Sequence, residues 1–206
     1  MALVTISRMY GSGGSHVARR VADALGWDLL DNRVVDAVAE RLGVSAAEVS
    51  AHEERVPSLV ERLAAAMTLS APEMLPVVDT NLPPTEARIV QVTEAVIEEA
   101  VQAGNLVLVG RGAQCLLANR PDALHVFCYA PPASLIAFAM SDRGVSHQEA
   151  ARIVETTNRQ REQYVKQHWN REWRAEENYD LCVNTGTLGI EGAARIVADL
   201  ARDRFE

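Results

Sequence analysis

The feature that most constrains this chain is a glycine-rich turn near its N-terminus. The apolar segment Leu3–Ser7 precedes the turn Gly11-Ser12-Gly13-Gly14, and Ser15–Leu25 follows with apolar residues at helical spacing. A strand, a glycine turn and a helix in this order form a cradle for anions, because backbone N–H groups meet at the turn and the helix N-terminus is partially positive. A tight turn without any ligand is the alternative that the glycine spacing leaves open.

The turn departs from the P-loop consensus G-x-x-x-x-G-K-[ST]. Alignment by its strand and helix assigns Gly14 to the lysine, His16 to the magnesium-binding hydroxyl and Arg8 to the first glycine. Without the lysine, the positive charge around a transferred phosphoryl group must come from arginine, from magnesium or from both. Arg8 lies inside the turn and is a candidate for this role.

Strand-like and helix-like segments alternate along the chain, which predicts a parallel sheet covered by helices. Several strand segments are almost uniformly apolar, as expected where both faces of a strand are covered. The predicted strands are Leu3–Ser7, Trp27–Leu30, Leu106–Gly110, Leu124–Ala130 and Leu181–Asn184. The predicted helices are Ser15–Leu25, Asn32–Leu42, Val56–Met67, Thr85–Ala103, Ala133–Met140, His147–His168 and Ile190–Arg204.

Two segments interrupt this alternation. Thr68–Pro84 contains four prolines and predicts a loop or an irregular insertion, whereas Asn158–Asn178 is polar and predicts a lid. Trp169 and Trp173 within it are interpreted as packing or lid contacts rather than as a platform for a base. A length of 206 residues fits one domain with a small lid.

Composition and charge exclude several classes of function. The net charge of −8 argues against a general nucleic-acid binder, although a local arginine cluster can still hold a small anion. We expect neither a membrane span nor a secretory signal, and therefore a cytoplasmic protein. Cys115, Cys128 and Cys182 match no zinc or redox spacing and are predicted to be buried, reduced thiols. The scattered histidines predict no metal site built from protein side chains.

Five motifs extend in a specific order over nearly the whole chain. They are Thr5-Ile6-Ser7-Arg8-x-Tyr10-Gly11-Ser12-Gly13-Gly14, Leu29-Leu30-Asp31, Val107-Leu108-Val109-Gly110-Arg111-Gly112-Ala113, Leu124-His125-Val126-Phe127-x-Tyr129-Ala130-Pro131 and Tyr179-Asp180-Leu181-Cys182-Val183-Asn184-Thr185. In this order the chain resembles the cytidylate-kinase-like family, relatives of the P-loop nucleoside-monophosphate kinases, in which the turn without the lysine looks like the usual form. The resemblance implies an α/β, three-layer P-loop NTPase fold with a five-stranded parallel sheet, helices on both faces and a small helical lid. Residues 1–206 would form a single domain, with the acceptor region at about 45–100 and the lid at about 140–178.

The same resemblance implies a phosphotransferase that uses ATP and Mg²⁺, with CMP as the acceptor. Its partners would be small-molecule nucleotides, with no nucleic acid and no membrane, and a homo-oligomer is left open. The residues implied to be catalytic are Arg8, Arg111 and Arg161. Those implied to hold the donor are Gly11, Ser12, Gly13, Gly14, Ser15 and His16, and those implied to hold the acceptor are Asp31, Arg88, Gln91 and Arg111.

The positions of the acceptor candidates have their own interpretation. Arg111 stands between two glycines after an apolar strand, where ligands bind in open α/β sheets. Arg88 and Gln91 are three residues apart and share a helix face, which is solvated in the simpler alternative. Asp31 either caps the following helix or contacts the acceptor.

The lid candidates leave the reaction open. Arg161 matches the lid arginine of related kinases better than Arg159 does, and Leu135 or a neighbour stands where another lid arginine is usual. The alternatives are therefore a catalytically impaired nucleotide-binding or sensing protein and a kinase for a non-nucleotide small molecule.

Overall fold

The structure is a computed structural model that describes residues 1–31, 33–47 and 86–205. The predicted helix Val56–Met67 and the predicted insertion Thr68–Pro84 lie outside these residues. The described strands are β1 (Leu3–Arg8), β2 (Asp28–Leu30), β3 (Leu106–Val109), β4 (Ala123–Tyr129) and β5 (Leu181–Asn184). The described helices are α1 (Gly14–Leu25), α2 (Arg33–Leu42), α5 (Glu86–Ala103), α6 (Ala113–Leu116), α7 (Pro132–Arg143), α8 (His147–Trp169), η1 (Glu176–Asn178) and α9 (Thr185–Phe205).

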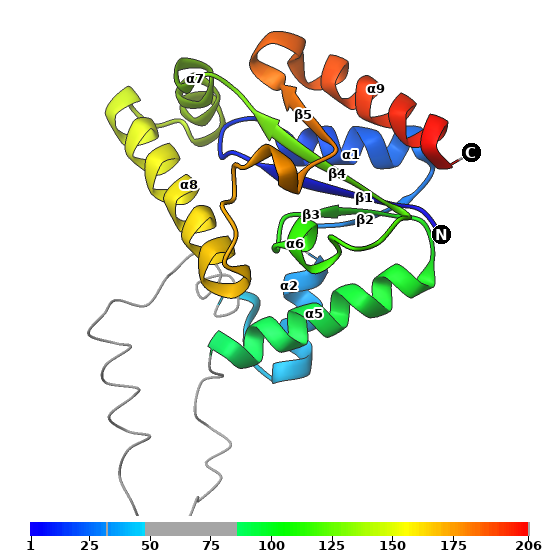
Figure 1. Cartoon of the computed structure of the whole chain (residues 1–206). Coiled ribbons are helices and arrows are strands. Elements are labelled where there is room, and N and C mark those ends of the chain that lie inside the picture. The colour runs from blue at the N-terminus through cyan, green and yellow to red at the C-terminus, as the bar shows by residue number, and fades with distance from the viewer. Residues whose placement is uncertain (32, 48–85, 206) are drawn as a thin grey trace, which may run out of the picture.

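A five-stranded sheet forms the middle layer, with the strand order β2-β3-β1-β4-β5 (Figure 1). All of its strand pairs are parallel. The chain builds one side of β1 with β2 and β3 and then crosses to the other side for β4 and β5. Such a switch of sides opens a crevice at the C-terminal ends of the strands, where ligands bind in open α/β sheets. The predicted α/β fold with a parallel sheet is confirmed.

Helices cover both faces of the sheet (Figure 1). Leu3 of β1 joins the buried cluster formed with α2 and α5, whereas Val4 and Ile6 join the cluster formed with α1 and α9. Successive residues of a strand point to opposite faces, so a strand buried on both sides must be apolar throughout. These strands are therefore apolar throughout because helices cover both of their faces.

Two helix predictions differ from the structure. The short α6 was not predicted, because four residues are too few to show a helical period. The last helix begins at Thr185 rather than at Ile190, and Gly189 interrupts it with φ 67° and ψ 172°. A glycine in this conformation separates two helical stretches, and only the second of them carries a continuous apolar stripe.

The segment after β4 forms α7 and α8 at the C-terminal end of the sheet (Figure 1). The chain then returns to the sheet, where Trp173 is buried with its ring 5.4 Å from that of Phe127. The hydroxyl of Tyr179 donates a hydrogen bond to the carbonyl of Trp173 at 2.6 Å. Trp173 is thus a packing residue, and it joins the end of the predicted lid segment to the sheet.

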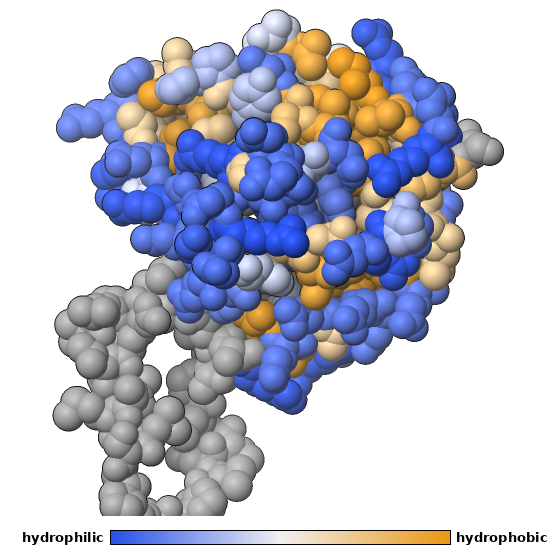
Figure 2. All heavy atoms as spheres, in the orientation of Figure 1, coloured by the Kyte–Doolittle hydropathy of each residue, from blue (hydrophilic) through white to orange (hydrophobic). Residues whose placement is uncertain are grey.

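The surface is mainly hydrophilic over α8, whereas hydrophobic residues gather over α9 (Figure 2). Leu188 and Ile196 of α9 are 41% and 38% exposed. Among the described helices, none has both the length and the apolar character that a membrane span requires.

The cysteines follow the predicted burial in two of three cases. Cys115 and Cys128 are buried, but Cys182 is exposed. The prediction of a buried thiol was wrong for Cys182 because it belongs to β5, an edge strand with a neighbour on one side only.

Candidate functional site

The C-terminal ends of the neighbouring strands β1 and β3 bring two arginines together. Arg8 is the last residue of β1, and Arg111 follows the end of β3 by two positions. A β-carbon on Gly110 would clash with Nη1 of Arg8, so the Arg8 guanidinium rests against the backbone next to Arg111. Burial and the nearby Arg8 charge lower the pKa of Arg111 to about 10, while Tyr164 and Asp31 raise it. Arg111 stays protonated at neutral pH, and two cations lie side by side.

The Arg8 side chain begins in the space that a side chain at position 14 would need. A β-carbon on Gly14 would clash with Cβ of Arg8 and lie 2.9 Å from its Cγ. The φ angle of Gly14 is not positive, so space rather than backbone conformation excludes a side chain there. The two departures from the P-loop consensus are therefore linked: an arginine replaces the first glycine, and a glycine replaces the lysine that would collide with it.

The same register corrects one prediction from the sequence. Ser15, and not His16, directly follows Gly14 and stands at the hydroxyl position of the consensus. His16 is exposed, and its ring lies edge-on to Phe138 of α7 at 5.9 Å. The assignment of His16 to the magnesium-binding hydroxyl was wrong by one residue, and the consensus hydroxyl is present in this chain.

The turn offers unpaired backbone amides to an anion. Ser12 uses its own amide within the turn, donating to the carbonyl of Met9 at 3.2 Å. Among the described residues, no hydrogen-bond acceptor is found for the amides of Gly11, Gly13, Gly14 and Ser15. These amides lie at the start of α1, where the helix dipole adds a partial positive charge.

Helix α8 contacts the entry of the turn. Nη1 of Arg161 donates to the carbonyl of Arg8 at 2.7 Å, and Oδ1 of Asn158 accepts from the amide of Tyr10 at 2.7 Å. The Arg161 guanidinium also lies 6.0 Å from the centre of the Tyr10 ring. Arg159 is exposed, so Arg161 is the arginine of this pair that reaches the turn. Of the three predicted catalytic arginines, Arg111 and Arg161 thus both lie next to Arg8.

The predicted acceptor residues divide into two groups. Asp31 is half-buried before α2, and its charge raises the pKa of Arg111, so these two residues belong to one site. Arg88 and Gln91 are exposed on α5. Within the described part of the chain, no hydrogen bond or ion pair connects either of them to Arg111. Their role in acceptor binding stays a prediction.

The backbone around Arg111 adopts an unusual conformation. Gly110, Arg111 and Gly112 all have positive φ, at 71°, 59° and 66°. A left-handed conformation costs a residue with a β-carbon about 1–2 kcal/mol, and such residues cluster at ligand sites. The flanking glycines avoid this cost, which explains the Gly-Arg-Gly pattern.

The sequence did not reveal how closely α8 approaches this second turn. A β-carbon on Gly112 would clash with the indole of Trp169, at the end of α8. Tyr164 lies edge-on to the same indole, with 5.6 Å between the ring centres, and it is among the residues that raise the pKa of Arg111. One helix therefore lies against both the glycine turn and the Arg111 turn. The sequence predicted packing or lid contacts for Trp169, but it did not indicate that Gly112 is the partner.

Residues 3–187 match the sequence profile of the cytidylate kinase-like family. The chain belongs to this family. It is similar to an uncharacterized protein from Eubacterium ventriosum ATCC 27560, with a TM-score of 0.71 and 17% identity over 98% of this chain and 99% of the other. It is also similar to shikimate kinase from Bacteroides thetaiotaomicron, with a TM-score of 0.52 and 14% identity over 98% of each chain. A comparison with curated proteins gave no match.

At these identities the solved structures show a shared P-loop kinase fold and nothing finer. The family match and this fold support a phosphotransferase in general terms. The site of this cytidylate kinase-like protein agrees with that class, because phosphoryl transfer requires positive charge and donors around the transferred group.

The described residues fit phosphate better than they fit an isolated metal ion. They contain no group of three or more His, Cys, Asp or Glu side chains that could hold a metal. Magnesium in nucleotide sites takes most of its ligands from phosphate and water and few from the protein. The absence of a metal centre formed by side chains alone stays a prediction.

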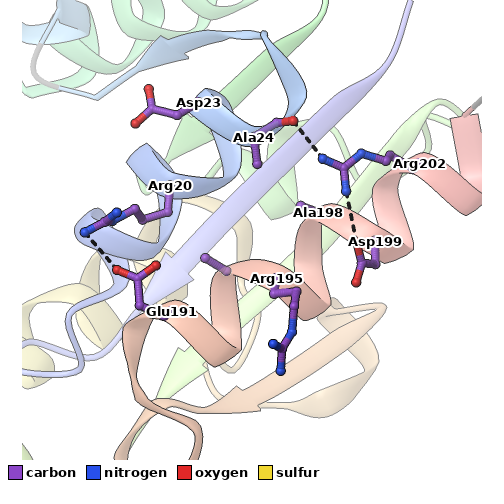
Figure 3. Close-up of a pocket in the computed structure, with 9 residues that line it drawn as sticks. Arg20, Asp23, Ala24, Glu191, Arg195, Ala198, Asp199 and Arg202 are labelled. Carbon is purple, nitrogen blue, oxygen red and sulfur yellow. Dashed lines mark hydrogen bonds and ion pairs between the residues drawn. The ribbon is translucent and has the colours of Figure 1, made fainter.

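A separate hollow between α1 and α9 lacks the features of this site (Figure 3). Four of its charged groups form ion pairs, Arg20 with Glu191 at 2.8 Å and Arg202 with Asp199 at 2.9 Å. Arg202 also donates to the carbonyl of Ala24 at 2.7 Å. We interpret these contacts as the connection of α9 to α1.

Replacing Gly112 with alanine tests the contact with Trp169. Gly112→Ala is expected to lower the free energy of unfolding by about 2–4 kcal/mol, because a β-carbon adds a clash to the left-handed strain. Gly144→Ala is the matched control, since Gly144 has a φ of 64° and no atom within 4 Å of its β-carbon position. Denaturant unfolding of both variants separates strain from clash, and equal losses would contradict the Trp169 contact.

Proposed function

We propose that this cytidylate kinase-like protein is a magnesium-dependent phosphotransferase that moves the γ-phosphoryl group of ATP to a small phosphate-bearing acceptor, with CMP as the first candidate. One observation carries the proposal: the Arg8 side chain fills the place of the P-loop lysine and lies beside Arg111. Catalysis of phosphoryl transfer rests on positioning and on charge neutralisation. The family-specific loss of the lysine therefore does not remove the cation that this chemistry needs.

Each part of the site has a role in this proposal. The amides at the start of α1 would hold the donor phosphates, with Arg8 supplying the charge of the missing lysine. Mg²⁺ bound with the nucleotide would neutralise the phosphates, with Ser15 as the protein group that faces it in the consensus. Transfer between two oriented substrates needs no protein base if positioning supplies most of the rate.

The electrostatics of Arg111 favour an acceptor that carries an anion. Burial and Arg8 lower the pKa of Arg111, which means that the protein holds two protonated guanidiniums together at a cost. A phosphate between them would remove this repulsion and accept paired hydrogen bonds from the planar guanidinium. CMP carries such a phosphate, and its selection over other monophosphates follows from the family resemblance alone.

A nucleotide-binding protein without catalysis is the second candidate, and two observations favour it. Arg161 already donates to the backbone of Arg8, so this lid arginine is engaged within the protein. Leu135, at the position where a further lid arginine is usual, is 1% exposed and packed between α7 and α8. The first occupies one N–H donor of the Arg161 guanidinium, and the second leaves an apolar side chain where a triphosphate would meet a cation.

A transfer assay distinguishes these candidates. Purified protein with ATP, Mg²⁺ and CMP is expected to form ADP and CDP, and the Arg111→Met variant is expected to raise the KM for CMP by about tenfold to a hundredfold, the loss of one or two charge-assisted hydrogen bonds. Calorimetry with ATP and CMP measures binding in parallel.

Binding without product would favour the second candidate. ATP consumption only with a non-nucleotide acceptor would mean that the protein is a kinase for a different small molecule. The proposal would be refuted if the protein showed no binding of ATP or CMP and formed no product.

A further inference from the structure

Two side chains of α8 form hydrogen bonds with the backbone at the entry of the glycine turn, where strand pairing ends. On the β3 side, the amide of Gly110 donates to the carbonyl of Ile6 in β1 at 3.1 Å. On the β4 side, the amide of Met9 donates to the carbonyl of Cys128 at 2.9 Å. Main-chain groups of successive strand residues point to opposite sides, so the Arg8 carbonyl points to the side of β3, and the Tyr10 amide follows two residues beyond the end of β1.

Strand β3 cannot serve these groups, because its chain turns away through the left-handed Gly110-Arg111-Gly112 segment. Oδ1 of Asn158 accepts from the Tyr10 amide, and Nη1 of Arg161 donates to the Arg8 carbonyl, each at 2.7 Å. In a parallel sheet, one residue of the neighbouring strand would supply this same acceptor and donor pair to the residues on either side of Met9. The two side chains, three residues apart on one helix face, take its place.

We infer that Asn158 is a positioning residue of the phosphate site, and that α8 is a fixed brace of the glycine turn at this point. Asn158 is 3% exposed, and removal of its side chain leaves the Tyr10 amide without this acceptor. Loss of the bond frees the segment that leads from Arg8 to the amides of Gly11–Ser15. The inference deepens the proposed function, since it concerns the same site, but the brace itself does not depend on catalysis.

The substitution Asn158→Ala tests the brace through hydrogen exchange measured by NMR. The Tyr10 amide is expected to exchange at least tenfold faster in this variant, while the amides of β1 and β4 keep their rates. The affinity for ATP with Mg²⁺, measured by calorimetry, is expected to fall about tenfold. Asn158→Asp keeps an acceptor oxygen at the same distance along the side chain and is expected to keep the slow exchange of Tyr10, while its negative charge is expected to weaken ATP binding. Glu155→Ala, an exposed change on the same helix, is the control.

Several results would overturn the inference. It fails if Asn158→Ala leaves Tyr10 exchange and ATP affinity within twofold of the wild type, or if exchange accelerates equally throughout the sheet. If the alanine variant does not fold, Asn158→Gln moves the acceptor by one methylene group and is expected to give the same changes. A wild-type protein that binds no ATP while Tyr10 exchange responds as expected would refute the proposed function and support the brace.

Discussion

Replacing Arg8 with methionine is expected to lower kcat/KM for phosphoryl transfer by about 10³-fold or more, the effect of removing a phosphate-neutralising arginine. Methionine retains an apolar stem that packs against Gly14 and loses only the guanidinium that rests on Gly110. The substitution also removes the repulsion between Arg8 and Arg111. Steady-state kinetics together with thermal unfolding separate the loss of charge from a loss of structure.

Matched variants make this result specific. Arg8→Lys retains a cation and is expected to keep part of the activity that Arg8→Met loses. Arg20→Met removes an exposed arginine of α1 that pairs with Glu191 of α9. This variant should change kcat/KM little. Activity of Arg8→Met within about threefold of the wild type would mean that another group supplies the charge, contrary to the assignment of Arg8.

Restoring the consensus lysine alone is expected to damage the protein. Gly14→Lys puts a β-carbon onto Cβ of Arg8, and because this contact involves the root of a side chain and not a flexible end, the backbone must shift. We expect a loss of about 3 kcal/mol in the free energy of unfolding, the upper range for overpacking of a buried site. Nucleotide affinity should fall together with stability, and both can be followed by denaturant unfolding and calorimetry.

The double substitution Arg8→Gly with Gly14→Lys should recover most of this loss. It recreates the sequence G-M-Y-G-S-G-K-S, which satisfies the P-loop consensus with Ser15 as the hydroxyl. The next neighbour of the new β-carbon is Cβ of Cys128 at 3.3 Å, which requires only a small adjustment. A coupling energy of about 2 kcal/mol between the two positions is expected from the complete cycle, with Arg8→Gly as its fourth corner. Additive effects would show that the two departures from the consensus are independent.

Much of the fold was predictable because it follows from local patterns. The apolar runs of β1, β3 and β4 must be buried on both faces, and the strand–turn–helix order of the first 25 residues fixes where an anion site lies. Arg111 was found for the same reason, as a charged residue between glycines at a strand end. The edge position of Cys182 and the four-residue helix α6 were not predictable, since neither leaves a periodic trace.

The site itself was only partly predictable. The sequence named Arg8, Arg111 and Arg161 separately, but they are 50 or more positions apart and only the strand order and α8 bring them together. Asp31 joined them, whereas Arg88 and Gln91 were found exposed. Asn158 was noticed as part of a polar lid segment, and nothing in that segment indicated a bond to the Tyr10 amide 148 positions away.

The sequence by itself determined the class of fold, the family and the presence of a glycine turn that lacks the P-loop lysine. The tertiary structure alone decided what this lack means. In the sequence, Gly14 indicates only that the P-loop lysine is absent. In the folded chain, the lack of a side chain at Gly14 leaves room for the Arg8 side chain, which extends to Gly110 and Arg111. The difference arises because local periodicity encodes which residues are buried, whereas the filling of one atom-sized space depends on residues that meet only after the sheet has formed.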